Sequence, residues 1–156
     1  MSELRVPTVA LAAEVLCADG RTFVGRIFVP ATASRHPGPM RPEEWMNEPA
    51  LFIPFLPDDA KAPVVMNKRE VLVLSVAAAS DFGDVVEGAE PPVRRVAVEA
   101  EDRRLEGEIV IDMPINKTRV LDYLNRPESF LTLRDGDRHH LVQKERITRV
   151  IEIREE

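Results

Sequence analysis

Two stretches of this 156-residue chain share one pattern: RPEEWMNEP at residues 41–49 and RVLDYLNRP at residues 119–127. Their arginine, asparagine and proline are identical and lie 78 residues apart in the chain. The acidic, aromatic and long apolar residues between them match in kind. A block of this length that occurs twice in one chain indicates an internal repeat.

Two further blocks repeat in the same order on either side of this motif. TFVGRIFV at 22–29 matches RLEGEIVI at 104–111, with an offset of 82 residues. VMNKREV at 65–71 matches LVQKERI at 141–147, with an offset of 76 residues. The offset falls along the chain because the first copy has longer loops. Three matched blocks in a shared order predict an internal duplication.

Each copy has the pattern of five short strands and one short helical segment. Apolar and polar residues alternate in stretches such as 96–99, which is typical of a half-buried strand. The repeated Arg-to-Asn motif has the spacing of one or two helical turns, which its proline ends. The strands expected in the first copy span 8–16, 22–29, 50–56, 63–67 and 70–76. Those expected in the second copy span 93–100, 104–111, 129–134, 139–143 and 146–153.

Charge divides the chain into two nearly neutral copies and an acidic connector. Residues 79–92 contain no lysine or arginine but have four acidic residues, two glycines and two prolines. This composition is typical of an extended linker. We therefore expect a first domain at 1–78, a linker at 79–92 and a second domain at 93–156.

Each copy is too short to bury a large core as an open sheet. Closing a short sheet into a barrel removes its exposed edges, which is the usual solution for small all-β domains. An open meander packed on its short helix is the alternative. The fold class expected is therefore mainly β, with two tandem small five-stranded antiparallel barrels that each carry one short helical segment.

The second copy resembles the Sm-like family of small, SH3-like barrels. Its pattern Leu105-x-Gly107-x-Ile109-x-x-Asp112 is similar to the second strand of that family. The stretch 144–150 lies where the family has its basic turn and last strand. The resemblance implies a small barrel, and it implies RNA or a nucleotide as a ligand.

The repeated motif also supplies candidate ligand-binding residues, Arg41 with Asn47 and Arg119 with Asn125. Arginine offers a planar fork of donors and asparagine adds a donor and an acceptor, which suits an anionic or peptide ligand. The alternative is structural, with Arg119 paired to Asp122 and the asparagine capping the helix. Because the motif occurs in both copies, the structural alternative is favoured.

Lys68 and Lys144 occupy matched turns before the last strand of each copy. They are candidates for the rim of a ligand site. The alternative is that both are ordinary solvated lysines.

The sequence offers no catalytic, metal or cofactor site. His139 and His140 are neighbours on an expected strand, so their side chains point to opposite faces. The three histidines and the single cysteine have no zinc-ligand spacing. Cys17 fits a small apolar position in a strand. No glycine-rich phosphate loop is present and no pair of carboxylates stands out, so we expect a protein that is not an enzyme.

Apolar runs in the first copy predict an interface. LFIPFL at 51–56 and VLVL at 71–74 do not alternate, and a strand that is apolar on both faces is normally covered on both. We expect this face to be buried against the second barrel or, slightly favoured, across a homo-oligomer interface. The residues expected there are Phe52, Phe55, Val71 and Val73.

Composition narrows the function classes. A net charge of −6 disfavours binding to a phosphate backbone, and no run of 18 apolar residues predicts a membrane span. A single cysteine fits a reducing cytoplasm. The function favoured is a non-enzymatic assembly or adaptor module that acts through protein–protein contacts. Recognition of RNA or a nucleotide by an Sm-like module is the alternative.

Overall fold

The computed structural model describes residues 7–78, 91–113, 116 and 119–154. The chain divides into two compact units, unit 1 at Met1–Val76 and unit 2 at Ala77–Glu156. Most of the predicted acidic linker, residues 79–90, lies outside the described residues.

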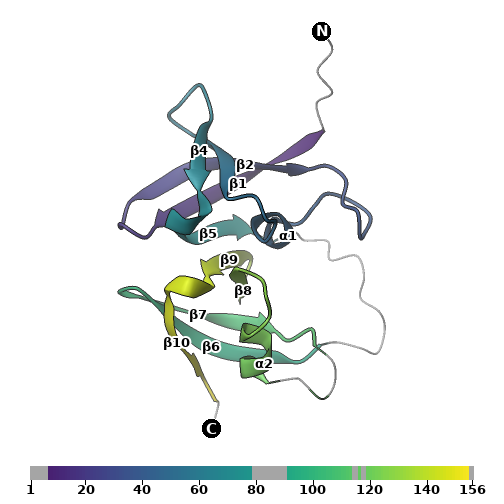
Figure 1. Ribbon diagram of the computed structural model, residues 1–156, viewed down its shortest axis with the longest axis vertical. Helices are drawn as coiled ribbons and strands as arrows, with labels where there is room; N and C mark the ends of the chain where they lie inside the picture. Colours follow the sequence, from purple (N-terminus) through teal and green to yellow (C-terminus); the bar gives the residue numbers. More distant parts are fainter. Residues whose placement is uncertain (1–6, 79–90, 114–115, 117–118, 155–156) are drawn as a thin grey trace. The chain divides into compact units, whose positions relative to one another are not determined.

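Unit 1 has five antiparallel strands, one short α-helix and one 3-10 helix (Figure 1). In chain order they are β1 (Thr8–Cys17), β2 (Thr22–Pro30), α1 (Pro42–Met46), β3 (Phe52–Pro57), β4 (Val64–Asn67), η1 (Lys68–Glu70) and β5 (Val71–Ala77). Their order in the sheet is β5-β1-β2-β3-β4.

Unit 2 has the same kinds of element in the same sequence. They are β6 (Val93–Ala100), β7 (Arg103–Val110), α2 (Val120–Leu124), β8 (Phe130–Asp135), β9 (Arg138–Gln143), η2 (Lys144–Arg146) and β10 (Ile147–Glu152). Their order in the sheet is β10-β6-β7-β8-β9, so in both units the fifth strand lies beside the first. The prediction of a mainly β chain is confirmed.

The sheet ladder of each unit remains open among the described residues, since the fourth strand pairs with the third and η1 or η2 then leads to the fifth. The second and third strands of each unit pair over only one or two residues. In unit 1 Gly25 pairs with Pro57 and Arg26 with Leu56. Beyond these pairs the β3–β4 hairpin is free to diverge from β2.

A glycine permits this junction in each unit. A Cβ atom on Gly25 would lie 2.1 Å from the carbonyl oxygen of Leu56 and 2.8 Å from the Phe55 ring. A Cβ atom on Gly107 would lie 2.4 Å from the carbonyl oxygen of Arg134. The third strand therefore approaches the second at a distance that only glycine accommodates.

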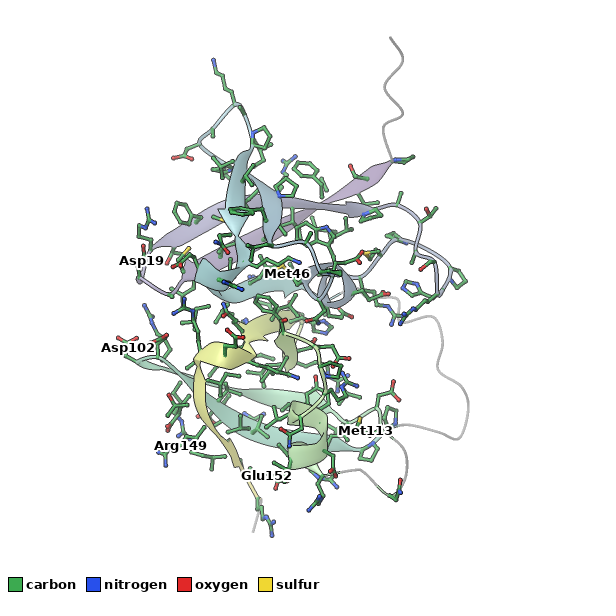
Figure 2. The ribbon with its side chains drawn as sticks, in the orientation of Figure 1. Asp19, Met46, Asp102, Met113, Arg149 and Glu152 are labelled. Carbon is green, nitrogen blue, oxygen red and sulfur yellow. The ribbon has the colours of Figure 1, made fainter. Side chains whose placement is uncertain are left out.

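The core of each unit forms from alternate residues of its strands. In β2 the inward residues are Gly25, Ile27 and Val29, and their neighbours along the strand are more exposed. Met46 of α1 is also buried in unit 1 (Figure 2), and Tyr123 of α2 is buried in unit 2. The helices therefore contribute one large side chain each to the apolar interior.

The same alternation changes the interpretation of β3. The run at 51–56 is apolar throughout, but Ile53 and Phe55 are buried while Phe52 and Pro54 are exposed. The β3 strand thus has a core face and an apolar outer face. In β5, by contrast, residues 71–74 are all buried.

Candidate interaction surfaces

The repeated Arg-to-Asn motif builds α1 and α2 in the same way. Arg41 and Arg119 are the N-cap residues of the two helices. The backbone N–H of Arg41 donates to Glu44 Oε1 at 3.1 Å, and that of Arg119 donates to Asp122 Oδ2 at 3.3 Å. In each helix the acidic third residue therefore satisfies an N–H that the helix leaves free.

The Arg119 side chain adds a second contact with the same carboxylate. Its Nε donates to Asp122 Oδ2 at 3.1 Å, and a terminal nitrogen donates to Oδ1 at 3.2 Å. This bidentate pair raises the pKa of Arg119 above its ordinary value. The ion pair considered as the structural alternative is therefore present.

The two asparagines end the helices. Asn47 Nδ2 donates to the Glu43 carbonyl at 2.8 Å, and Asn47 is the C-cap of α1. Asn125 is the C-cap of α2, where its backbone N–H donates to the Leu121 carbonyl at 3.1 Å. The arginine and asparagine of one motif lie at opposite ends of a helix, about 9 Å apart along its axis. The motif does not bring them to one spot.

Lys68 and Lys144 make the same contact in the two units. Lys68 Nζ donates to the Glu48 carbonyl at 2.8 Å, and Lys144 Nζ donates to the Arg126 carbonyl at 3.0 Å. Each acceptor directly precedes the proline that follows the helix. Loss of hydration lowers the pKa of both lysines, and Lys68 is only 6% exposed. Both ammonium groups therefore tie a 3-10 turn to the segment after the helix.

The four residues predicted at an interface have different environments. Phe55, Val71 and Val73 are buried, whereas Phe52 is 53% exposed. Phe52 is therefore the member of this set that another molecule can reach.

Phe52 belongs to an apolar outer face on the β3–β4 hairpin. Pro54 lies two residues along β3 on the same side, and it is paired with Val65 of β4, which is 70% exposed. Leu51 and Val64 are also exposed, but Leu51 precedes Phe52 and Val64 pairs with the buried Phe55, so both belong to the opposite face of the hairpin. We call the set Phe52, Pro54 and Val65 the outer face.

The outer face adjoins an open strand edge. β4 is the last strand in the order of unit 1, and β3 is its partner. Its sequence VVMN, residues 64–67, has no charged residue. Edge strands usually carry lysine, proline or a bulge that discourages further pairing, and β4 has none of these.

The histidines and the cysteine serve the fold of their units. His36 bonds to Glu44 and to the Pro37 carbonyl, and the contact with the carbonyl is the main reason that its pKa is raised. Burial lowers the pKa of His139 and raises the pKa of the Cys17 thiol, which disfavours a reactive thiolate. Among the described residues no three His, Cys, Asp or Glu side chains are grouped to hold a metal ion.

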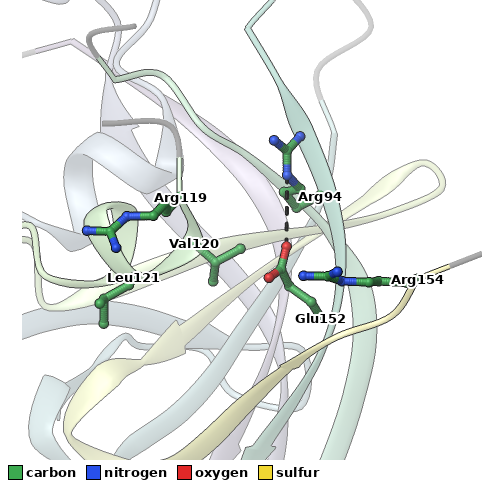
Figure 3. A pocket seen from close by; sticks show the side chains of 6 residues that line it. All are labelled: Arg94, Arg119, Val120, Leu121, Glu152 and Arg154. Carbon is green, nitrogen blue, oxygen red and sulfur yellow. Dashed lines mark ion pairs between the residues drawn. The ribbon is translucent and has the colours of Figure 1, made fainter. Parts of the chain in front are cut away.

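Arg119 also lines a hollow in unit 2 that sequence reasoning missed (Figure 3). Its other charged residues are Arg94, Glu152 and Arg154, from three positions far from Arg119 in sequence. The sequence signal that could have located this hollow was the expected closed barrel, in which the first and last strands of a copy lie side by side. A barrel expectation does not give the register of those two strands, so the sequence did not show that residue 94 lies near residues 152–154.

Comparisons with known proteins identify no relative. No protein-family model matches the chain, and neither the curated proteins nor the solved structures contain a match to it. No helix in the described part of the chain has the length and apolar character needed to span a membrane.

Proposed function

We propose that this protein is a non-enzymatic assembly or adaptor module that acts through protein–protein contacts, with the outer face as its contact surface. The observation that carries the proposal is the exposure of Phe52 and Val65 side by side with Pro54. Monomeric soluble proteins rarely leave large contiguous apolar patches in water, and such patches mark interaction sites. The single cysteine is the reason for placing this activity in the cytoplasm.

The size of the outer face suits a contact surface. The three apolar residues of this face, with Phe52 53% and Val65 70% exposed, leave roughly 250–300 Å² in water, near the lower end of the range of the largest patches on typical monomers. Covering this area is worth several kcal/mol at about 25 cal/mol per Å² before the costs of association are subtracted. This gain supports association at micromolar rather than nanomolar concentration.

A second copy of the chain is the occupant that we propose. The outer face is apolar, and neither β3 nor β4 has a charged residue, so the same face of another copy offers it a matching partner. Packing one outer face on the other about a twofold axis takes Phe52 and Val65 of both chains out of water. An isologous contact of this kind closes as a dimer.

The alternation along β3 gives a clean test of this proposal. Phe52→Glu places a charge on the outer face, so it should abolish dimers while the melting temperature stays within about 3 °C of wild type. Val24→Glu is the matched control, because Val24 of β2 is as exposed as Phe52, at 54%, and does not belong to the outer face. Size-exclusion chromatography with light scattering reads the mass of each protein.

The outcomes separate the alternatives. A wild-type dimer that Phe52→Glu converts to a folded monomer supports the proposal. A wild-type monomer up to about 200 µM overturns a role for a second copy, because it exceeds the expected dissociation constant. A dimer that Phe52→Glu leaves intact overturns the outer face as its interface.

We also infer that the two units arose by duplication of one small SH3-like barrel. Three features support this: the shared strand order, the shared 3-10 turn before the fifth strand, and glycine at the matched positions Gly25 and Gly107. The matched lysine contacts of Lys68 and Lys144 add a fourth. In this proposal each unit is a partly open barrel whose third and fourth strands fold away from the second.

A further inference from the structure

Unit 2 contains a hollow of about 400 Å³ that is rich in arginine (Figure 3). The residues that line it are Arg94, Arg119, Val120, Leu121, Glu152 and Arg154. Its three guanidinium groups and one carboxylate give the lining a formal charge of +2, and Asp122, which pairs with Arg119 beside it, lowers the net charge there to +1. Pockets of this volume lie at the lower end of the range for small organic ligands.

The three arginines come from separate parts of the chain. Arg94 is the second residue of β6, Arg119 is the N-cap of α2, and Arg154 follows the end of β10. The backbone N–H of Ile153 donates to the Arg95 carbonyl at 2.9 Å, which holds the end of β10 beside the start of β6. The fold therefore brings three arginines to the lining of one hollow, with the Arg119 guanidinium pointing away from those of Arg94 and Arg154 in Figure 3.

The donors of these arginines are only partly used. Arg94 Nη1 donates to the Val93 carbonyl at 3.2 Å, and Arg94 Nε lies 3.9 Å from Glu152 Oε1, the ion pair drawn in Figure 3, which is longer than a hydrogen bond. Asp122 occupies two nitrogens of Arg119, and a guanidinium carries five N–H donors. Donors thus remain for oxygens that enter the hollow.

The fold does not require these charges, because unit 1 lacks most of them. The strand registers identify equivalent positions: Glu152 pairs with Val96 in unit 2, and Val76 pairs with Ala13 in unit 1. Val96 and Ala13 are in turn the partners of the matched glycines on the next strand. Glu152 of unit 2 therefore corresponds to Val76 of unit 1.

The arginines follow the same correspondence. Arg94 corresponds to Leu11, since each pairs with the isoleucine two residues after the matched glycine. Arg154 corresponds to Ala78, two residues beyond the position of Glu152. Arg119 alone has a charged counterpart, Arg41. Of the four charged lining positions in unit 2, three therefore have an uncharged residue at the equivalent position of unit 1.

We propose that this hollow binds a small organic dianion, either a phosphate monoester or a dicarboxylate. Arginine recognises both groups because its planar fork matches their paired oxygens. A ligand with two negative charges can engage more than one of the three guanidinium groups at once, which a monoanion does less well. Val120 and Leu121 supply an apolar wall for the carbon part of the ligand, and Leu121 is 57% exposed. The site is independent of the outer face on unit 1.

The affinity expected is modest because the arginines are partly in water. The Arg94 side chain is 42% exposed and the Arg119 side chain is 73% exposed. Exposed charge pairs contribute little each and are screened by salt, so we expect a dissociation constant of about 0.1–1 mM at low ionic strength.

A titration of the full-length protein followed by ¹H–¹⁵N NMR tests the proposal. Phenyl phosphate and succinate are the two dianionic probes, acetate is the monoanion, and benzyl alcohol is the neutral apolar probe. The expected result is a saturable shift of the Arg94, Val120 and Leu121 signals with at least one dianion. The probe that binds distinguishes a phosphate ligand from a dicarboxylate.

Charge variants give opposite predicted effects. Arg94→Gln and Arg154→Gln should each weaken binding about two- to fivefold, and Glu152→Gln should strengthen it about twofold. Arg103→Gln is the control, because Arg103 is an exposed arginine about 20 Å away at the other end of the β6–β7 hairpin.

Three results would overturn the site. The first is an absence of saturable shifts with both dianions at about 10 mM, which is tenfold above the weakest expected dissociation constant. The second is an equal loss of affinity in Arg103→Gln. The third is equal affinity for acetate and for the dianions, which would show that the hollow does not distinguish a ligand with two negative charges from one with a single charge.

Discussion

Gly25 is the residue at which β2 and β3 of unit 1 meet, and replacing it with alanine tests the fold directly. The added Cβ would lie 2.1 Å from the Leu56 carbonyl oxygen and 2.8 Å from the Phe55 ring. Ordinary contacts of this type are more than an ångström longer than the first of these distances. Since the nearest atom belongs to the backbone, β3 has to move as a strand.

The cost follows from what that movement breaks. It separates the two register pairs, Gly25 with Pro57 and Arg26 with Leu56, that join β2 to β3. Losing one or two hydrogen bonds and straining the core around Phe55 costs about 3 kcal/mol in total. This is a large part of the stability of a domain of this size and lowers its melting temperature by more than about 10 °C.

Urea unfolding followed by circular dichroism measures this loss. Arg26→Ala is the matched control, because its side chain is exposed on the next position of β2, and it should change stability by less than about 0.5 kcal/mol. Gly107→Ala should be destabilising in the same direction, since its Cβ would lie 2.4 Å from the Arg134 carbonyl oxygen. A loss below about 1 kcal/mol in Gly25→Ala would refute the close approach.

Three further results are expected. Lys68→Ala should cost about 1–3 kcal/mol in urea unfolding, because it leaves the Glu48 carbonyl without its 2.8 Å partner; a neutral effect would contradict the structural role. Burial lowers the pKa of His139 in the folded chain, so the unfolded chain takes up the proton first as the pH falls below about 6.5. The free energy of unfolding should therefore decrease below that pH, and His139→Gln should make this decrease smaller than in the wild type. With a net charge of −6, the chain should bind single-stranded RNA with a dissociation constant above about 1 µM at physiological salt. A nanomolar dissociation constant by fluorescence polarisation would favour RNA recognition over the adaptor function.

Local patterns were sufficient to predict the elements of this chain. Alternating residues predicted the strands, and the Arg-to-Asn motif predicted one or two helical turns in each copy that its proline ends. The structure has one short helix at each motif, which begins after the arginine and has the asparagine as its C-cap. The matched turns that contain Lys68 and Lys144 are 3-10 helices in the structure, at Lys68–Glu70 and Lys144–Arg146. These features depend on neighbours within about four residues, which a sequence records directly.

Features that depend on register were not predictable in the same way. The run at 51–56 is apolar on both faces, so the sequence did not indicate that Phe55 enters the core while Phe52 stays exposed. That choice is fixed by the junction at Gly25. The arginine hollow likewise depends on the pairing of β6 with β10, which brings Arg94 and Arg154 to one place. The predicted closed barrel depends on strand curvature, and the ladder seen here stays open.

In the proposed dimer, the outer face of unit 1 contacts the outer face of a second copy. An isotope-filtered NOE experiment on a mixture of ¹³C-labelled and unlabelled chains detects this contact between chains. We expect intermolecular NOEs between the Phe52 ring of one chain and the Val65 methyl groups of another, and their loss in Phe52→Glu. Intermolecular NOEs that involve neither residue, or none in a sample concentrated well above the expected dissociation constant, would contradict it.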